Sequence, residues 1–171
     1  AGEWGVRGHF GVEPRLFPQV ARFAAQAERP TSTSVFAEPR LEVELATRRD
    51  SFTLVPFARY DSDDANRSHF DLREANWLRV GDGWDIVVGI DRVFWGVTES
   101  RHLVDIINQT DGVEGIDGEA KLGQPMVNLN LIGDWGTLRL YALPGFRERT
   151  FAGADARLRG PLRISGDANF G

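Results

Sequence analysis

Histidine, serine and carboxylate side chains are the residues of this chain whose types could support catalysis or metal binding. Its three histidines, His9, His69 and His102, are too far apart in the sequence to form a metal-binding motif. His102 and Asp105 have helical spacing, but no Gly-x-Ser-x-Gly motif supplies a nucleophile for them to activate. The absence of cysteine excludes thiolate metal sites, cysteine nucleophiles and disulfide bonds. These patterns predict a protein that is not an enzyme and uses no metal or cofactor.

Charged residues recur at alternate positions in several segments, which is the pattern of one polar face of a β-strand. Nearly all the cations are arginines, since Lys121 is the only lysine, and the planar guanidinium suits packed ion pairs. The residues predicted to face one water-filled side are Arg7, Arg15, Arg40, Glu42, Glu44, Arg59, Arg73, Arg79, Asp85 and Asp91. Neighbouring carboxylates such as Glu42 and Glu44 follow from strand geometry alone, so we prefer a pore wall of paired charges to a catalytic pair. The alternative is the solvated face of a soluble sheet.

Seven segments with period-two alternation would position these charges. They cover approximately residues 4–16, 35–45, 52–60, 69–80, 84–94, 127–131 and 137–142. In the first segment Val6, Phe10 and Leu16 share one face, and Arg7 and Arg15 share the other. This alternation lasts for about a dozen residues, roughly twice the usual length of a soluble strand and enough for a tilted membrane-spanning strand.

Short and long connections alternate between these segments. The short ones lie near residues 48–50, 81–83 and 133–136, where glycine and aspartate suit tight hairpins. The long ones cover roughly residues 17–33, 61–67, 96–125 and the chain from Pro144 onward. Bacterial outer-membrane barrels sort their connections in this way, with short turns on one side of the membrane and long loops on the other.

Aromatic residues gather near the ends of the predicted strands, as in the two aromatic belts of a membrane barrel. Trp4, Phe52 and Trp84 would form one belt, and Tyr60, Phe70 and Phe94 the other. Trp77 and Trp95 have the opposite parity and are expected to face the lumen.

Three prolines, Pro14, Pro39 and Pro56, lie within predicted strands. Because proline cannot donate a ladder hydrogen bond, each one predicts a bulge, a position at the rim or a misplaced strand boundary.

The connection over residues 96–125 is too long for a plain link. A short helix is expected over residues 101–107. The link either folds into the lumen and narrows it or caps the mouth of the barrel, and the sequence leaves both open. The candidate constriction residues are Arg101, His102, Asp105, Glu114 and Asp117.

Composition is compatible with this interpretation. Apolar residues make up 42% of the chain and charged residues 26%, an ordinary balance that a barrel with unlike faces also shows. No stretch approaches the roughly 18 consecutive apolar residues of a membrane helix. The net charge of −5 argues against a nucleic-acid partner. The chain enters patterned sequence directly from Ala1, as expected of an exported protein whose signal peptide has been removed.

Several runs of residues carry a resemblance to a known family. They are Phe70 to Ala75, Val93 to Gly96, Leu103 to Asn108 and Pro144 to Arg149. Over roughly residues 67–160 the chain resembles porin-like outer-membrane proteins of Gram-negative bacteria, a largely uncharacterised family. The resemblance implies a pore or solute-binding barrel, and it brings no catalytic residues with it.

We therefore expect an all-β fold in one domain over residues 1–171, an antiparallel up-and-down transmembrane β-barrel with about seven strands present. Bacterial single-chain barrels use even strand numbers, so the barrel should be incomplete. The chain would then be the N-terminal part of a longer protein, or the missing strands would come from another copy.

The expected function is a porin-like channel of the bacterial outer membrane, with the lipid bilayer and small solutes as partners. One alternative is a soluble, secreted β-sandwich or barrel that binds a ligand such as a carbohydrate. Another is an outer-membrane enzyme on the same scaffold.

Overall fold

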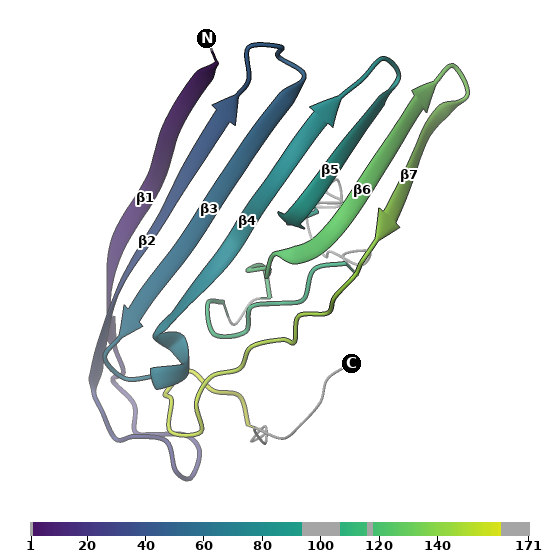
Figure 1. Cartoon of the computed structure of the whole chain (residues 1–171). Helices are drawn as coiled ribbons and strands as arrows, with labels where there is room; N and C mark the ends of the chain where they lie inside the picture. The colour runs from purple at the N-terminus through teal and green to yellow at the C-terminus, as the bar shows by residue number, and fades with distance from the viewer. Residues whose placement is uncertain (1, 94–106, 116–117, 162–171) are drawn as a thin grey trace.

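Seven antiparallel strands form one open sheet in a computed structural model that describes residues 2–93, 107–115 and 118–161. Each strand pairs with its neighbours in sequence, in the order β1 to β7 (Figure 1). The strands are β1 (Glu3–Leu16), β2 (Thr31–Glu44), β3 (Asp50–Asp61), β4 (His69–Val80), β5 (Trp84–Asp91), β6 (Gln124–Gly133) and β7 (Gly136–Ala142). A single 3₁₀ turn, η1 (Ala65–Arg67), precedes β4. The all-β fold and all seven predicted strands are confirmed.

Tight hairpins join β2 to β3, β4 to β5 and β6 to β7, as the sequence predicts. Arg48, Gly83 and Gly136 take the positive φ angles that these turns require, at 53°, 76° and 121°. These hairpins lie at one end of the strands, which we call the turn end. We call the other end of the strands, where the long connections begin, the loop end. The longest strands, β1 and β2, have 14 residues each and are paired over their whole length.

A line of backbone irregularities crosses the first four strands. Gly8 in β1 pairs with Pro39 in β2. The β2–β3 ladder is interrupted between Ala37↔Ala58 and Leu41↔Leu54, and the register that these pairs share places Pro39 opposite Pro56. Neither proline has an N–H group to donate to the ladder. Because the two prolines lie opposite each other, both missing hydrogen bonds fall at the same place in the sheet. We call the line formed by Gly8, Pro39, Pro56 and the adjoining bulge in β4 the seam.

The bulge confirms the expectation for Pro56. Val55 pairs with Glu74 but Pro56 pairs with Leu72, so Arg73 is an extra residue in β4. Pro14 and Pro39, in contrast, keep a continuous register with β2 and β1.

The bulge also reverses the alternation of β4, which corrects two predictions. Arg73 and Glu74 both face the charged side of the sheet. Beyond them Trp77 pairs with Phe52 and Val88 on the apolar side, where the sequence predicted a lumenal tryptophan. Arg79 shares the parity of Trp77 and lies 3.7 Å from Asp50, so it does not line the charged face as predicted. Uninterrupted alternation was the wrong assumption for this strand.

The two faces of the sheet are inverted relative to a soluble fold. Large apolar residues point outward and are exposed, including Trp4 at 77%, Val6 at 59% and Phe10 at 86%. Buried positions on the other face are held mainly by charged and polar residues, such as Arg59, Asp71 and Arg73. The described residues therefore do not bury their outward apolar residues in a compact hydrophobic core, unlike soluble proteins.

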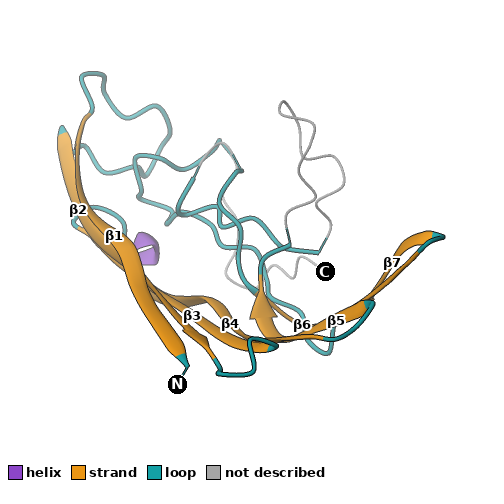
Figure 2. Cartoon of the chain, turned by 90° about the horizontal axis from the view of Figure 1, so that it is seen from above, coloured by secondary structure: helices purple, strands orange, loops and turns teal. Residues whose placement is uncertain are grey.

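The sheet is curved, and its charged face is concave. Loops lie within the curve, on the concave side (Figure 2). They include the described parts of the link between β5 and β6, 107–115 and 118–123, and the segment 143–161 that follows β7. The predicted helix at residues 101–107 falls almost entirely outside the described residues, as do Phe94 and Trp95. None of the helical structure in the described residues is long and apolar enough to cross a membrane.

Candidate functional site

The concave face is divided by the seam into two parts. We call the half at the loop end the covered part, because residues 107–115 and 118–123 of the link and the segment 143–161 lie against it. The half at the turn end is the open part. Most residues predicted to line a pore lie on one or the other.

Arg59 is the centre of the covered part on β3. Its side chain is only 4% exposed, and its Nε donates to both carboxylate oxygens of Glu114 at 2.9 and 3.0 Å. Its Nη1 donates to Glu13 at 3.1 Å and to the hydroxyl of Ser34 at 2.8 Å. The guanidinium carbon lies 4.5 Å from the centre of the Phe36 ring. Arg59 thus joins β1, β2, β3 and the link in one buried contact.

Arg73, the bulged residue of β4, has an equivalent position one strand further along. Its Nη1 lies 2.6 Å from Asp111 and 3.1 Å from Asp71, and all three side chains are nearly or fully buried. Asp71 also accepts a hydrogen bond from Arg147 at 2.5 Å. Asp111 accepts one from the hydroxyl of Thr150 at 2.5 Å. Arg73 therefore holds the link directly, and its partners Asp71 and Asp111 hold the C-terminal segment.

A row of four rings lies beneath these arginines. His9, Phe36, Phe57 and His69 run across β1 to β4, with successive ring centres 5.6, 6.3 and 5.5 Å apart. Arg73 lies 4.4 Å from the centre of the Phe57 ring. The guanidiniums thus gain cation–π contacts in a region from which water is largely excluded.

Asn108 holds the start of the described link in place. Its amide nitrogen donates to the carbonyls of Asp91 and Leu122, each at 2.9 Å, and its amide oxygen accepts from Val93 N–H at 2.8 Å. The side chain is 3% exposed. One buried asparagine therefore fixes the link to the end of β5.

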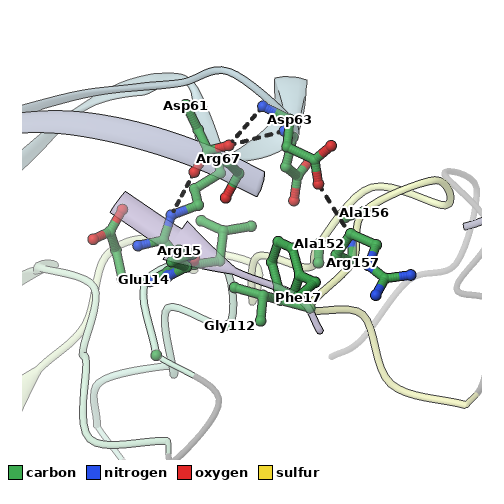
Figure 3. A pocket seen from close by; sticks show the side chains of 15 residues that line it. Arg15, Phe17, Asp61, Asp63, Arg67, Gly112, Glu114, Ala152, Ala156 and Arg157 are labelled. Carbon is green, nitrogen blue, oxygen red and sulfur yellow. Dashed lines mark hydrogen bonds and ion pairs between the residues drawn. The ribbon is translucent and has the colours of Figure 1, made fainter. Parts of the chain in front are cut away.

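A pocket of about 280 Å³ opens at the loop end, beyond the covered part (Figure 3). It is built from the end of β1, the β3–β4 connection, the link and the C-terminal segment, which contribute Phe17, Asp63, Gly112 and Ala156 among others. Cations and carboxylates both line it. Arg67 and Asp61 pair with each other, and Arg15, Asp63 and Glu114 pair with residues outside the lining.

Arg67 and Asp64 frame this pocket from the β3–β4 connection. Arg67 lies 3.2 Å from Asp61 and 3.1 Å from Glu13. Burial, followed by the nearby cations Arg59 and Arg15, lowers the pKa of its guanidinium. Burial likewise raises the pKa of the Asp64 carboxyl, which accepts hydrogen bonds from the N–H groups of Gly153 and Asn66.

The open part carries a chain of ion pairs that is accessible at its Arg7–Glu42 end and buried at Glu74. Glu42 contacts Arg7 at 3.0 Å and Arg40 at 2.7 Å. Arg40 reaches Glu74 at 2.6 Å, and Glu74 contacts Arg92 at 2.8 Å. The side chains of Arg7 and Glu42 are 69% and 40% exposed. A hollow of about 330 Å³ lies beside them, lined by Arg7, Gly8, His9, Glu38, Arg40 and Val55.

On β5 and β6 the concave face carries carboxylates and amides that lie opposite each other. Asp85 accepts a hydrogen bond from Asn130 at 2.5 Å, and Asp91 accepts one from Asn76 at 3.2 Å. The amide oxygens of Asn128 and Asn130 are buried without a hydrogen-bond partner in the described structure.

The predicted site residues divide accordingly. By strand register, Arg7, Arg15, Arg40, Glu42, Glu44, Arg59, Arg73, Asp85 and Asp91 are on the concave face, and Arg79 is on the outer face. Of the constriction candidates, Glu114 contacts Arg59, whereas Arg101, His102, Asp105 and Asp117 lie outside the described residues. Arg15 pairs with Glu13 at 3.0 Å.

Sequence reasoning missed the residues that link the loops to the sheet. Arg67, Asp111 and Arg147 lie in connections, where no periodicity indicates direction. Glu74 was not among the predicted residues, because only the bulge at Arg73 turns it toward the concave face. The one available signal was the proline at position 56.

Comparison with known protein families, curated proteins and solved structures finds no match for this chain. Within residues 2–93, 107–115 and 118–161, no cluster of three or more histidine, aspartate or glutamate side chains could hold a metal ion.

Proposed function

We propose that the chain forms part of a porin-like channel in a bacterial outer membrane. Its apolar outer face would contact acyl chains, and its charged concave face would line a water-filled lumen for small solutes. Further strands, from the rest of a longer chain or from another copy, would close the barrel, because an open sheet edge in lipid is very costly.

The observation that supports this proposal most strongly is the inverted polarity of the sheet. Outward residues such as Val6, Leu41 and Leu138 are 59%, 37% and 44% exposed, while Arg59, Arg73 and Asp111 are buried. That distribution is unfavourable in water, and large exposed apolar patches on soluble proteins are usually interaction sites. A bilayer favours it.

The covering segments suggest how the lumen is shaped. The described parts of the link lie on the concave side and are tied to β3 and β4 through Glu114 and Asp111. We propose that the link narrows the lumen, and that solutes pass along the open part, where Arg7, Glu42 and Arg40 are accessible. The carboxylates of the covered part are paired with arginines, so a transport role fits them better than acid–base catalysis.

Planar-bilayer recording of the full-length protein tests the channel. We expect stepwise conductance, and higher conductance in a variant whose link 109–121 is replaced by a short glycine-serine turn. Unchanged conductance after this replacement would contradict the constriction role. A protein that stays soluble and monomeric without detergent would contradict the membrane assignment.

A pair of arginine substitutions tests the lipid-facing side directly. Leu54→Arg places a charge on the outer face. It should lower the free energy of unfolding by about 2–4 kcal/mol if that face lies in lipid near the bilayer midplane. Thr53→Arg, at the next position of β3, faces the concave side and is the matched control. Equal losses in the two variants would contradict the proposal.

The pocket at the loop end favours a second candidate function. A volume of about 280 Å³ suits one small polar ligand, as expected of a soluble ligand-binding sheet. Saturable sugar binding by the detergent-free protein, without conductance, would support this alternative.

A further inference from the structure

His69, the first residue of β4, lies where the link meets the sheet. Its Nδ1 is 3.0 Å from the carbonyl oxygen of Arg67. A carbonyl oxygen accepts hydrogen bonds and cannot donate them, so Nδ1 carries the hydrogen. The neutral ring therefore has its lone pair on Nε2, and the direction of that atom decides what the ring can do.

The Nε2 atom points toward two carboxylates of the link. It lies 3.9 Å from Asp111 Oδ2 and 3.8 Å from Glu114 Oε1, both beyond hydrogen-bond length. It is buried and has no hydrogen-bond partner. Both carboxylates are themselves buried, with side chains 0% and 9% exposed. In the neutral ring, a lone pair thus faces two negative groups, which is unfavourable in a region of low dielectric.

We propose that His69 is a proton-dependent latch that holds residues 107–115 of the link against β4. Protonation of the ring puts a second N–H group, with positive charge, between Asp111 and Glu114, where charge-assisted hydrogen bonds can form. The link is then held most tightly at low pH. The attachment weakens as pH rises and the ring loses its proton.

The two carboxylates next to the ring belong to a wider network of ion pairs. Asp111 of the link pairs with Arg73 of β4, which also contacts Asp71 and, through it, Arg147 of the C-terminal segment. Glu114 of the link pairs with Arg59 of β3, which also contacts Glu13 of β1 and, through it, Arg67 of η1 and Asp61 of β3. The carboxylates in this set each contact an arginine, and arginine keeps its charge at any ordinary pH. Imidazole is the side-chain type in this cluster that ordinarily changes charge near neutral pH.

The latch does not depend on the channel function, because it concerns the attachment of one segment to the sheet. Hydrogen exchange of the full-length protein in detergent micelles can follow it directly. The reporting amides are those of Asp111 and Leu122, which donate to the carbonyls of Ala120 and Gln109 at 2.8 and 2.9 Å. After correction for intrinsic exchange rates, their protection should fall roughly tenfold between about pH 5.5 and pH 8, the effect of one charge-assisted hydrogen bond.

Three variants make the test decisive. His69→Gln keeps a side-chain N–H donor that does not titrate, so the pH dependence of protection should disappear. Glu114→Gln removes one of the two carboxylates and should reduce that dependence. His9→Gln is the matched control, since this exposed ring packs edge-on against Phe36 on the same face, and it should behave like the wild type.

Two results would overturn the latch. One is wild-type protection that does not change with pH. The other is a pH dependence that persists in His69→Gln or, if that variant does not fold, is undiminished in Glu114→Gln. The pH dependence of conductance tests the channel proposal and the position of the link. Only the exchange measurement tests the latch.

Discussion

The covered and open parts of the concave face contain the same kind of ion pair but are suited to different roles. Both consist of arginine–carboxylate pairs. In the covered part Arg73 and Asp111 are 4% and 0% exposed, whereas in the open part Arg7 and Glu42 are 69% and 40% exposed. Buried charges are costly to leave unpaired, and exposed pairs contribute little to stability. The covered part is therefore suited to holding the loops, and the open part to presenting charge to a solute.

Replacing Arg73 by methionine should break this comparison most severely. Asp111 would keep a fully buried carboxylate without its cation, at a cost of about 3–5 kcal/mol. Urea unfolding of the full-length protein from lipid vesicles measures the loss. Arg7→Met in the open part is the control and should cost less than about 1 kcal/mol. Equal losses would show that burial does not distinguish the two parts.

Replacing Gly8 by alanine tests the seam between the two parts. Gly8 has a φ of 154°, and an added Cβ would lie 2.5 Å from the Glu38 carbonyl oxygen and 2.6 Å from Pro39 Cα. We expect a loss of about 1–3 kcal/mol from the strained backbone. Gly5→Ala, on the same strand with nothing within 4 Å of the added atom, should be nearly neutral in the same unfolding experiment. If Gly8→Ala is as stable as the wild type, the strands can shift at the seam.

Replacing Arg40 by glutamine should change selectivity more than stability. Glu42 and Glu74 would lose a shared cation, so the channel should shift toward cations. Glu74 is buried but keeps its ion pair with Arg92 at 2.8 Å, so stability should fall by less than about 1 kcal/mol. The reversal potential in a salt gradient measures the shift. Arg79→Gln removes the same charge from the outer face, and a similar shift in this control would contradict the assignment of the two faces.

Replacing Asp64 by asparagine should have the smallest effect, and one that depends on pH. Burial raises the pKa of this carboxyl, so the folded protein binds its proton more tightly than the unfolded chain does. The resulting stabilisation is complete at acid pH and is lost as pH rises through the folded-state pKa. Asparagine removes this loss, so the Tm of the variant should rise relative to wild type between about pH 4 and pH 7. Asp82→Asn, with a side chain 92% exposed, should show no such trend.

Alternation along the chain predicted the seven strands, their hairpins and most of the concave face, because the side chains of a strand alternate strictly with position. It failed at one residue. The bulge at Arg73 reversed the direction of Trp77 and Arg79, and Pro56 indicated that a bulge was possible without showing which strand would contain it. The partners of the covered part, Asp111 above all, could not be predicted, since loops have no period from which to read orientation.

The way the covering segments cross the sheet has a consequence for the order of folding. Every strand pairs with its neighbour in sequence, so the sheet can grow hairpin by hairpin through short loop closures. The covering contacts are far more distant along the chain: Gln26 binds the carbonyl of Ala156, 130 residues away. Such closures are slow, and they need both partners already in place. We therefore expect a folding intermediate with a formed sheet and an unfilled interior, in which the charged concave face is still fully hydrated.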